Sequence, residues 1–188
     1  MKKSICLLLL LGLLMSLAAC APRVYAPTGE KTGNAELDEA VLTLLQEICD
    51  AKASDAENLG CAYDFVANEI TYRAGTVDTS GGFTDELTNE LALSLLQKRK
   101  GNCDAQAALM TVLLRRMGCE ATVVQGTFLR AGEQTPVDHA WVYAIVDGNG
   151  CYFDPLYGGH YAEEARDYCM VSAEKLSETH QWNAPEQN

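Results

Sequence analysis

The sequence predicts an α+β domain in which helices come first and an antiparallel sheet follows. Between residues 34 and 117, apolar residues recur with the period of roughly 3.6 that amphipathic helices have. After Gly118 the pattern changes to short segments rich in Val, Thr, Tyr and Phe, with Gly- and Asp-containing turns between them. No internal repeat is present. Helices and strands segregated in this way favour a sheet packed against helices.

Three amphipathic helices are predicted in the first half of the chain. Each places apolar side chains on one face, and they cover residues 34–51, 55–72 and 85–98. Asn34 is a suitable cap for the first helix. The segment between the second and third helices, residues 74–84, is predicted to be a loop because it is rich in Gly, Ser and Thr.

The fourth helix is the most helix-favouring apolar segment of the chain, CDAQAALMTVLLRRM from Cys103 to Met117. Gly101 and Asn102 precede it, and Gly118 ends it. We expect it to be the central buried helix. Strands are predicted at residues 121–129, 139–146 and 151–154. The DGNG sequence at 147–150 has the composition of a hairpin turn.

The N-terminus has the layout of an export signal. Lys2 and Lys3 precede an apolar run from Ile5 to Leu14, and small residues follow up to Cys20. The apolar run is too short to cross about 30 Å of hydrocarbon as a stable helix. Residues 1–19 are therefore predicted to be a cleaved signal peptide.

The Leu-Ala-Ala-Cys sequence at 17–20 resembles the lipobox of bacterial lipoproteins. The resemblance implies that the Cys20 sulfur receives a diacylglycerol group, and two acyl chains make a stable membrane anchor. It also implies a protein that is exported and lipid-anchored to the outer face of the bacterial cell membrane or envelope. The alternative is an ordinary signal peptide with a chance Cys at this position.

Residues 20–34 are predicted to be a flexible tether, because they contain Pro and Gly and almost no aliphatic side chains. Residues 35–188 then form one domain, long enough for a substantial core. The formal charge of the whole chain is -12, and subtracting the positive charges of Lys2 and Lys3 gives -14. This acidity argues against a nucleic-acid partner and against electrostatic binding to anionic lipid.

Six of the eight cysteines remain after Cys6 leaves with the signal and Cys20 takes the lipid. They lie in an exported domain, where disulfides are chemically allowed: Cys49, Cys61, Cys103, Cys119, Cys151 and Cys169. Bridges between Cys49 and Cys61 and between Cys151 and Cys169 are conceivable, but sequence does not settle connectivity. If Cys103 stays a free thiol, at least one other cysteine is unpaired or paired between molecules.

Cys103, His139 and Asp154 are the residues that the predicted fold would bring together. Cys103 begins the buried helix, His139 begins one strand and Asp154 ends the next. A helix N-terminus favours a thiolate and can receive an oxyanion through its free amides. A His facing the thiolate would act as base and then as acid, and an Asp behind it would fix the tautomer of the ring. Otherwise, Cys103 is half of a disulfide or a core thiol, and Asp154 is only a turn former.

Three motifs at these positions resemble the core of the transglutaminase-like superfamily. They are Gly-x-Cys opening a helix at 101–103, His-Ala-Trp opening a strand at 139–141, and Asp-Pro closing the next strand at 154–155. ANEITYR at 67–73 and MVSAEKLSETHQW at 170–182 resemble flanking segments of that superfamily. The resemblance covers most of residues 55–182. It implies a papain-like fold with Cys103 as nucleophile, His139 as general base and acid, and Asp154 as orienting carboxylate.

The resemblance also implies a type of reaction. The superfamily includes amide-crosslinking enzymes, peptidases, deglycosylating amidases and inactive members, and its active members attack a carboxamide with a thiolate to give a thioester. We therefore expect a surface-tethered cysteine peptidase or acyltransferase, without a cofactor, whose substrate is a cell-wall peptide or an extracellular protein.

Two other functions are open. The first is a catalytically silent domain that binds a peptide or protein partner. The second is a cell-wall amidase of another papain-like branch, but the Asp-Cys dipeptide associated with those enzymes is absent, since Asn102 precedes Cys103.

Further candidates lie around the three motifs. Trp141 is two residues from His139 and therefore on the same face of the strand. We expect Trp141 to bind substrate as a wall of the site, with a place in the core as the alternative. Gln97 and Gln106 are both candidates for the second oxyanion donor, and the sequence does not choose between them.

The other histidines are expected to be structural. His160 and His180 lack a motif context, with a substrate-side position as the alternative for His180. Three His without paired ligand spacing do not predict a metal site.

Overall fold

The computed structural model describes residues 24–130, 133–162, 164 and 166–183. The predicted signal peptide and the predicted lipid attachment site at Cys20 lie outside these residues and stay predictions. Within the described part, no helix is both long enough and apolar enough to cross a bilayer.

The helices follow local capping signals. Their bounds are α2 (Ala35–Ile48), α3 (Asp55–Asn68), α4 (Asp85–Lys98), α5 (Cys103–Arg116), α6 (Pro155–His160) and α7 (Ala173–Leu176). Asn34 caps α2 by accepting from the backbone N–H groups of Glu36 and Leu37. Ser54 and Glu57 form a capping box at the start of α3. The helix predicted for residues 55–72 is shorter than expected, because the chain turns into a strand after Asn68.

The strands form one five-stranded antiparallel sheet and one small parallel pair. Their bounds are β1 (Thr71–Tyr72), β2 (Lys100–Gly101), β3 (Glu120–Phe128), β4 (Val137–Val146), β5 (Asn149–Phe153), β6 (Cys169–Val171) and β7 (His180–Gln181). The order in the large sheet is β6-β5-β4-β3-β7. The predicted α+β architecture, with a central helix packed on an antiparallel sheet, is therefore confirmed.

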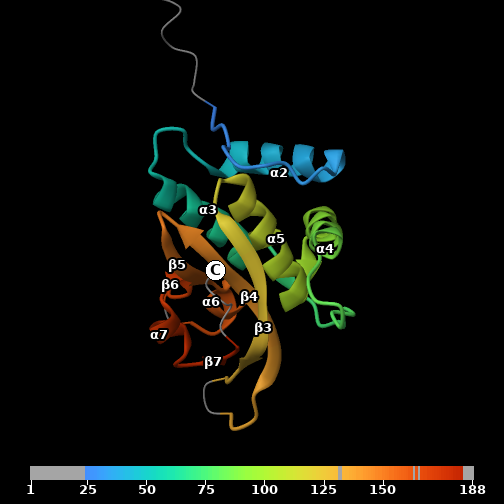
Figure 1. Ribbon diagram of the computed structural model, residues 1–188, viewed down its shortest axis with the longest axis vertical. Helices are drawn as coiled ribbons and strands as arrows, with labels where there is room; N and C mark the ends of the chain where they lie inside the picture. Colours follow the sequence, from blue (N-terminus) through green and yellow to red (C-terminus); the bar gives the residue numbers. More distant parts are fainter. Residues whose placement is uncertain (1–23, 131–132, 163, 165, 184–188) are drawn as a thin grey trace, which may run out of the picture.

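Helix α5 is the centre of the core, as predicted. All ten residues from Ala105 to Leu114 are buried. Figure 1 shows α5 between α3 and α4, with β3 and β4 running across it. The β4 residues Ala140, Val142 and Ala144 pack in the core with α5. Because side chains alternate along a strand, this packing directs His139 and Trp141 to the other face of the sheet.

A second, aromatic-rich cluster covers that other face. It consists of Val124, Phe128, Trp141, Tyr152, Tyr157, Tyr168 and Leu176. Helices α6 and α7 and strand β7 belong to this layer, and they lie together at the lower left of Figure 1. The sequence pattern does not predict these elements or β6, because each has only two to six residues and no extended hydrophobic period.

The described part of the predicted tether, residues 24–34, differs from the expectation of free chain. It contains no helix or strand, but its backbone lies against the end of α5. The Gly29 N–H donates to Arg116 O at 3.0 Å, and the Arg116 guanidinium donates to Gly29 O at 2.5 Å. An added Cβ at Gly29 would lie 1.8 Å from Arg115 O, so this close approach depends on glycine.

Candidate active site

Cys103 is the first residue of α5, and its position is set by the residue before it. The Asn102 side chain accepts a hydrogen bond from the Ala105 N–H at 3.2 Å, which caps the helix. The Asn102 amide also donates to Gly75 O at 3.1 Å and to Asp104 Oδ2 at 2.8 Å. Cys103 is a half-buried free thiol. The partial positive charge of the helix N-terminus stabilises an anion there.

His139 lies on β4 opposite Gly126 of β3 and is buried. Its Nε2 lies 2.7 Å from Asp154 Oδ2. Burial alone would lower the pKa of His139, but Asp154 and then Cys103 outweigh it and raise this pKa from 6.5 to about 10. Nδ1 has no hydrogen-bond partner among the described residues. Since Nε2 is bonded to Asp154, Nδ1 is the ring atom available to the Cys103 thiol.

Asp154 connects β5 to α6 and is fully buried. Its Oδ1 caps α6 by accepting from the Tyr157 N–H at 2.9 Å, while Oδ2 faces His139. Burial alone would raise the pKa of Asp154, but His139 and, after it, His180 hold the pKa of this carboxyl well below its usual range. The structure thus brings Cys103, His139 and Asp154 together in the order in which a nucleophile, a base and an orienting carboxylate would act.

A known protein family matches most of this chain. A family model described as the transglutaminase-like superfamily matches residues 42–155, more than half of the chain, and this range contains all three residues. The chain belongs to the transglutaminase-like superfamily.

Solved structures show the same fold. A provisionally assigned cysteine protease from Cytophaga hutchinsonii matches with a TM-score of 0.50 and 18% identity, over 76% of this chain and 41% of that one. A structure described as a TGase matches with a TM-score of 0.50 and 18% identity, over 68% of this chain and 33% of that one. This transglutaminase-like chain therefore spans less than half the length of either structure. No curated protein sequence is similar enough to match it.

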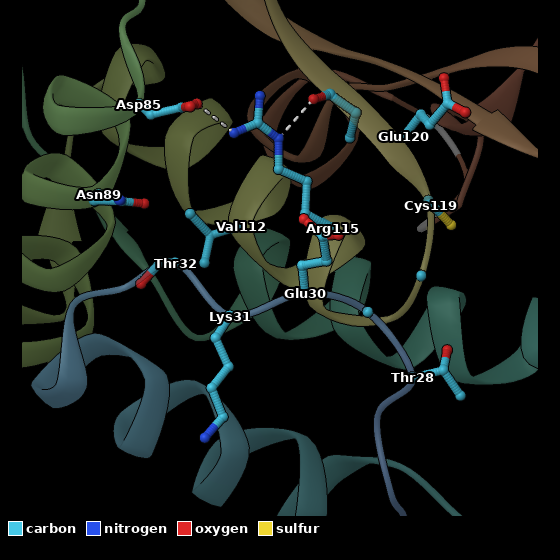
Figure 2. A pocket seen from close by; sticks show the side chains of 13 residues that line it. Thr28, Glu30, Lys31, Thr32, Asp85, Asn89, Val112, Arg115, Cys119 and Glu120 are labelled. Atoms are coloured by element: carbon cyan, nitrogen blue, oxygen red, sulfur yellow. Dashed lines mark hydrogen bonds and ion pairs between the residues drawn. The ribbon is translucent and has the colours of Figure 1, made fainter.

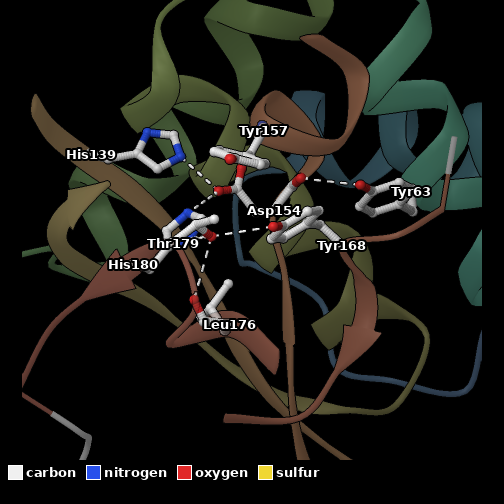
Figure 3. A network of polar contacts seen from close by, with 8 residues as sticks. All are labelled: Tyr63, His139, Asp154, Tyr157, Tyr168, Leu176, Thr179 and His180. Atoms are coloured by element: carbon white, nitrogen blue, oxygen red, sulfur yellow. Dashed lines mark hydrogen bonds and ion pairs between the residues drawn. The ribbon is translucent and has the colours of Figure 1, made fainter. Parts of the chain in front are cut away.

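His180 is the residue of this transglutaminase-like site whose place the sequence analysis missed. It was expected to be structural or to face the substrate. It is 1% exposed, on β7, and its Nε2 lies 2.8 Å from Asp154 Oδ2 (Figure 3). The segment MVSAEKLSETHQW already resembled family members in the sequence, but nothing in that pattern indicates which side chain His180 contacts.

His139, Asp154 and His180 also offer three ligand atoms within 4.8 Å of one another. The two N–O distances of 2.7 and 2.8 Å are hydrogen-bond lengths. Tetrahedral ligands about 2.1 Å from a zinc ion lie farther apart than this. We therefore interpret the group as a hydrogen-bond network.

Trp141 does not have the predicted substrate-binding position. It is 0% exposed, so no substrate can touch it in this structure. Its ring centroid lies 5.7 Å from that of His139 and 4.9 Å from that of His180. Trp141 therefore supports both imidazoles from behind, which was the core alternative of the sequence analysis.

The outer rim of the site carries Tyr72, Tyr161 and Arg130, none of which the sequence analysis selected. The two tyrosines are 44% and 42% exposed. Burial, and after it Cys103, raises the pKa of Tyr72. The Arg130 guanidinium lies 5.6 Å from the ring centroid of Tyr161.

The two candidate oxyanion donors have different surroundings. Gln97 donates to Glu36 on α2 at 2.8 Å and is exposed, so it is not part of the site. Gln106 lies one turn into α5 and is 1% exposed, and its Nε2 has no partner among the described residues. Of the two, only Gln106 stays a candidate.

The conceivable disulfides are absent, because all six cysteines of the described part are free thiols. In the β5–β6 register Cys169 pairs with Phe153 and not with Cys151. Cys49 Sγ lies 3.9 Å from Asn58 O, where it is placed to donate a weak hydrogen bond. Cys103 is thus not held in a disulfide in this structure.

A cavity of about 800 Å³ lies at the other end of α5 (Figure 2). It is lined by residues 28–32, by Asp85 and Asn89 of α4, and by residues around Arg115. Arg115 spans it by donating to Asp85 Oδ1 at 2.7 Å and to Ala121 O at 2.8 Å. None of the three site residues lines this cavity, so its size does not make it the active site.

Proposed function

We propose that this chain is a cysteine enzyme that acts on amide bonds through a thioester, as a peptidase or an acyltransferase. The main support for the proposal is the arrangement of the Cys103, His139 and Asp154 side chains at the N-terminus of α5. Cys103 begins the helix and raises the pKa of His139 together with Asp154, which is bonded to Nε2. Nδ1 has no other partner among the described residues. Asp154 and Cys103 also outweigh burial and raise the pKa of His139, and shifted pKa values of this kind are concentrated at functional sites.

The proposed reaction has two halves. The Cys103 thiolate attacks the carboxamide carbon, and the His139 imidazolium gives its Nδ1 proton to the leaving nitrogen as the carbon–nitrogen bond breaks. A thioester and a free amine result. Water or a second amine then attacks the thioester and gives a proton to Nδ1, and the carbon–sulfur bond breaks to restore the thiolate. Asp154 keeps the ring oriented in both halves.

The proposed oxyanion contacts come from the start of α5. The backbone N–H of Cys103 belongs to the first turn, where helical amides have no partner within the helix. Such an amide can stabilise the oxyanion of the tetrahedral intermediate. Gln106 is the remaining side-chain candidate for the second donor.

The proposed substrate and location come from the sequence. A lipid on Cys20 would hold the enzyme at the outer face of the membrane, where cell-wall peptides and extracellular proteins are available. Replacing Cys20 by Ser in the full chain should release the protein from washed membranes. Retention of C20S on membranes would contradict lipid anchoring and leave the enzyme proposal intact.

The test of the enzyme proposal is site-resolved alkylation. The purified chain is treated with iodoacetamide across pH 4 to 9, and each modified cysteine is located by mass spectrometry. We expect Cys103 to react first at acidic pH. The half-buried Cys119, which lies outside the site, is the internal control. If Cys103 reacts no faster than Cys119 at any pH, the enzyme proposal fails and a binding domain takes its place.

A further inference from the structure

His180 makes contacts that packing alone does not require. Its Nε2 approaches the same carboxylate oxygen as His139 Nε2, so Asp154 Oδ2 lies between two imidazoles (Figure 3). Its Nδ1 lies 2.8 Å from Thr179 Oγ1. The Tyr168 hydroxyl lies 3.2 Å from the same Thr179 oxygen. Both ring nitrogens of a fully buried histidine therefore have partners.

The contact with Asp154 places a hydrogen on Nε2 of His180. An ionised carboxylate only accepts hydrogen bonds, so His180 Nε2 must carry a hydrogen and donate it to Asp154. Nδ1 faces the Thr179 hydroxyl, which also contacts the Tyr168 hydroxyl and lies 3.5 Å from Leu176 O. His180 thus serves as a buried hydrogen-bond donor to Asp154.

Asp154 needs such a donor because its carboxylate has two tasks. Oδ1 caps α6 through the Tyr157 N–H, and Oδ2 must face His139. The group is 0% exposed, so water does not stabilise its charge. A donor on Oδ2 stabilises the charged form and helps to hold that oxygen toward His139.

We propose that His180 is a positioning residue that keeps the Asp154 carboxylate ionised and turned toward His139. The catalytic part of this inference rests on the proposed function. The effect on Asp154 itself does not, so the two can be tested separately.

Few other charged or titratable groups face Asp154 in the described part of the chain. His139 comes from β4 and His180 from β7, and the Cys103 thiol of α5 lies beyond His139. The Tyr63 hydroxyl of α3 donates to the backbone oxygen of Asp154 at 3.1 Å, and Tyr157 and Tyr168 lie near His180. The phenols stay neutral in the acidic range, so a shift there reports on the imidazoles.

The test compares two substitutions of His180. His180→Phe keeps an aromatic ring among Phe128, Trp141, Tyr157 and Tyr168, whose centroids lie 4.9 to 5.9 Å away, but removes the donor. His180→Gln keeps an N–H donor of similar reach. His160→Phe, an exposed histidine outside the network, is the matched control.

The first measurement is the carboxyl ¹³C shift of Asp154 against pH. In H180F we expect Asp154 to protonate about one pH unit higher than in the parent chain, whereas H180Q and H160F follow the parent. If Asp154 protonates at the same pH in H180F as in the parent chain, the proposal is overturned. This measurement does not depend on the reactivity of Cys103.

The second measurement is the rate of Cys103 alkylation by iodoacetamide at pH 7. The rate should fall about tenfold in H180F, as expected for the loss of one hydrogen bond to a charged group, and return in H180Q. A fall in both variants would reduce His180 to a packing role and overturn the proposal. An unreactive parent thiol would refute the proposed function alone, and the ¹³C titration would then decide the role of His180.

Discussion

The two ends of α5 each carry a half-buried cysteine, in opposite surroundings. Cys103 begins the helix, and Cys119 follows its last turn, with its N–H donating to Leu114 O at 3.0 Å. The N-terminal end has a partial positive charge and the C-terminal end a partial negative one. Two thiols of similar exposure are therefore placed in opposite helix-end fields.

The side chains around each thiol strengthen the contrast. His139 lies beside Cys103, and Asp154 holds the imidazole in place. Burial, and after it Asp147 and Asp55, raises the pKa of the Cys119 thiol. The two thiols therefore differ in the charges that face them rather than in exposure, and we expect this difference to decide which of them is reactive.

Removing His139 should have the largest effect on the difference in reactivity between Cys103 and Cys119. In His139→Ala we expect Cys103 alkylation by iodoacetamide at pH 6 to slow by about 100-fold, because a positioned acid–base partner contributes on that scale. Cys119 lies at the other end of α5 and should react as in the parent chain. The ratio of the two rates, read by mass spectrometry from one sample, checks this. A ratio that H139A leaves unchanged would mean that the imidazole does not activate Cys103.

A smaller effect is expected when the contacts that hold each end of α5 to the rest of the fold are disturbed. Gly126 lies opposite His139, and an added Cβ there would lie 2.2 Å from Gln181 O on β7 and 2.7 Å from the Trp141 ring. Gly126→Ala should therefore lower the free energy of unfolding by about 2 kcal/mol, as overpacking does. It should also slow Cys103 alkylation, because β7 carries His180.

Gly29→Ala is the matched variant at the other end, where the new Cβ would lie 1.8 Å from Arg115 O. Urea unfolding should show a loss of stability for both variants, whereas only G126A should slow Cys103. Equal slowing in both would mean that the β3–β7 contact does not position the site.

The sequence predicted the N-terminal end of α5 better than it predicted the aromatic-rich layer formed by α6, α7 and β7. Cys103, His139 and Asp154 lie in motifs next to strong helix and strand signals, and the helix at 85–98 has the bounds that its periodicity predicted. These features depend on residues close together in the chain. Local pattern is therefore enough to find them.

His180 and Trp141 show what local pattern does not contain. His180 meets Asp154 across 26 residues, through a two-residue strand that forms only by pairing with the end of β3. Trp141 shares a strand face with His139, but α6, α7 and β7 cover that face and bury the indole. Whether a side chain on a strand face meets substrate or core depends on what packs over it, and short elements without a hydrophobic period decide that here.

The smallest expected effect is a pH dependence of alkylation by charged and neutral reagents, which should differ between Cys103 and Cys119. Because the pKa of His139 is raised to about 10, the imidazolium beside Cys103 keeps its charge at neutral pH and loses it as the pH rises through about 10. Iodoacetate is an anion and iodoacetamide is neutral, and both react with the thiolate, so the ratio of their rates cancels the thiolate fraction. At Cys103 the rate with iodoacetate divided by the rate with iodoacetamide should be several-fold higher at pH 7 than at pH 11, since a nearby cation attracts the anionic reagent.

Cys119 is the control for this measurement. Asp147 and Asp55 face its sulfur, so the same rate ratio should stay low at every pH. A flat ratio at Cys103 would show that no cation adjoins this thiol, and the two ends of α5 would then differ in geometry but not in charge.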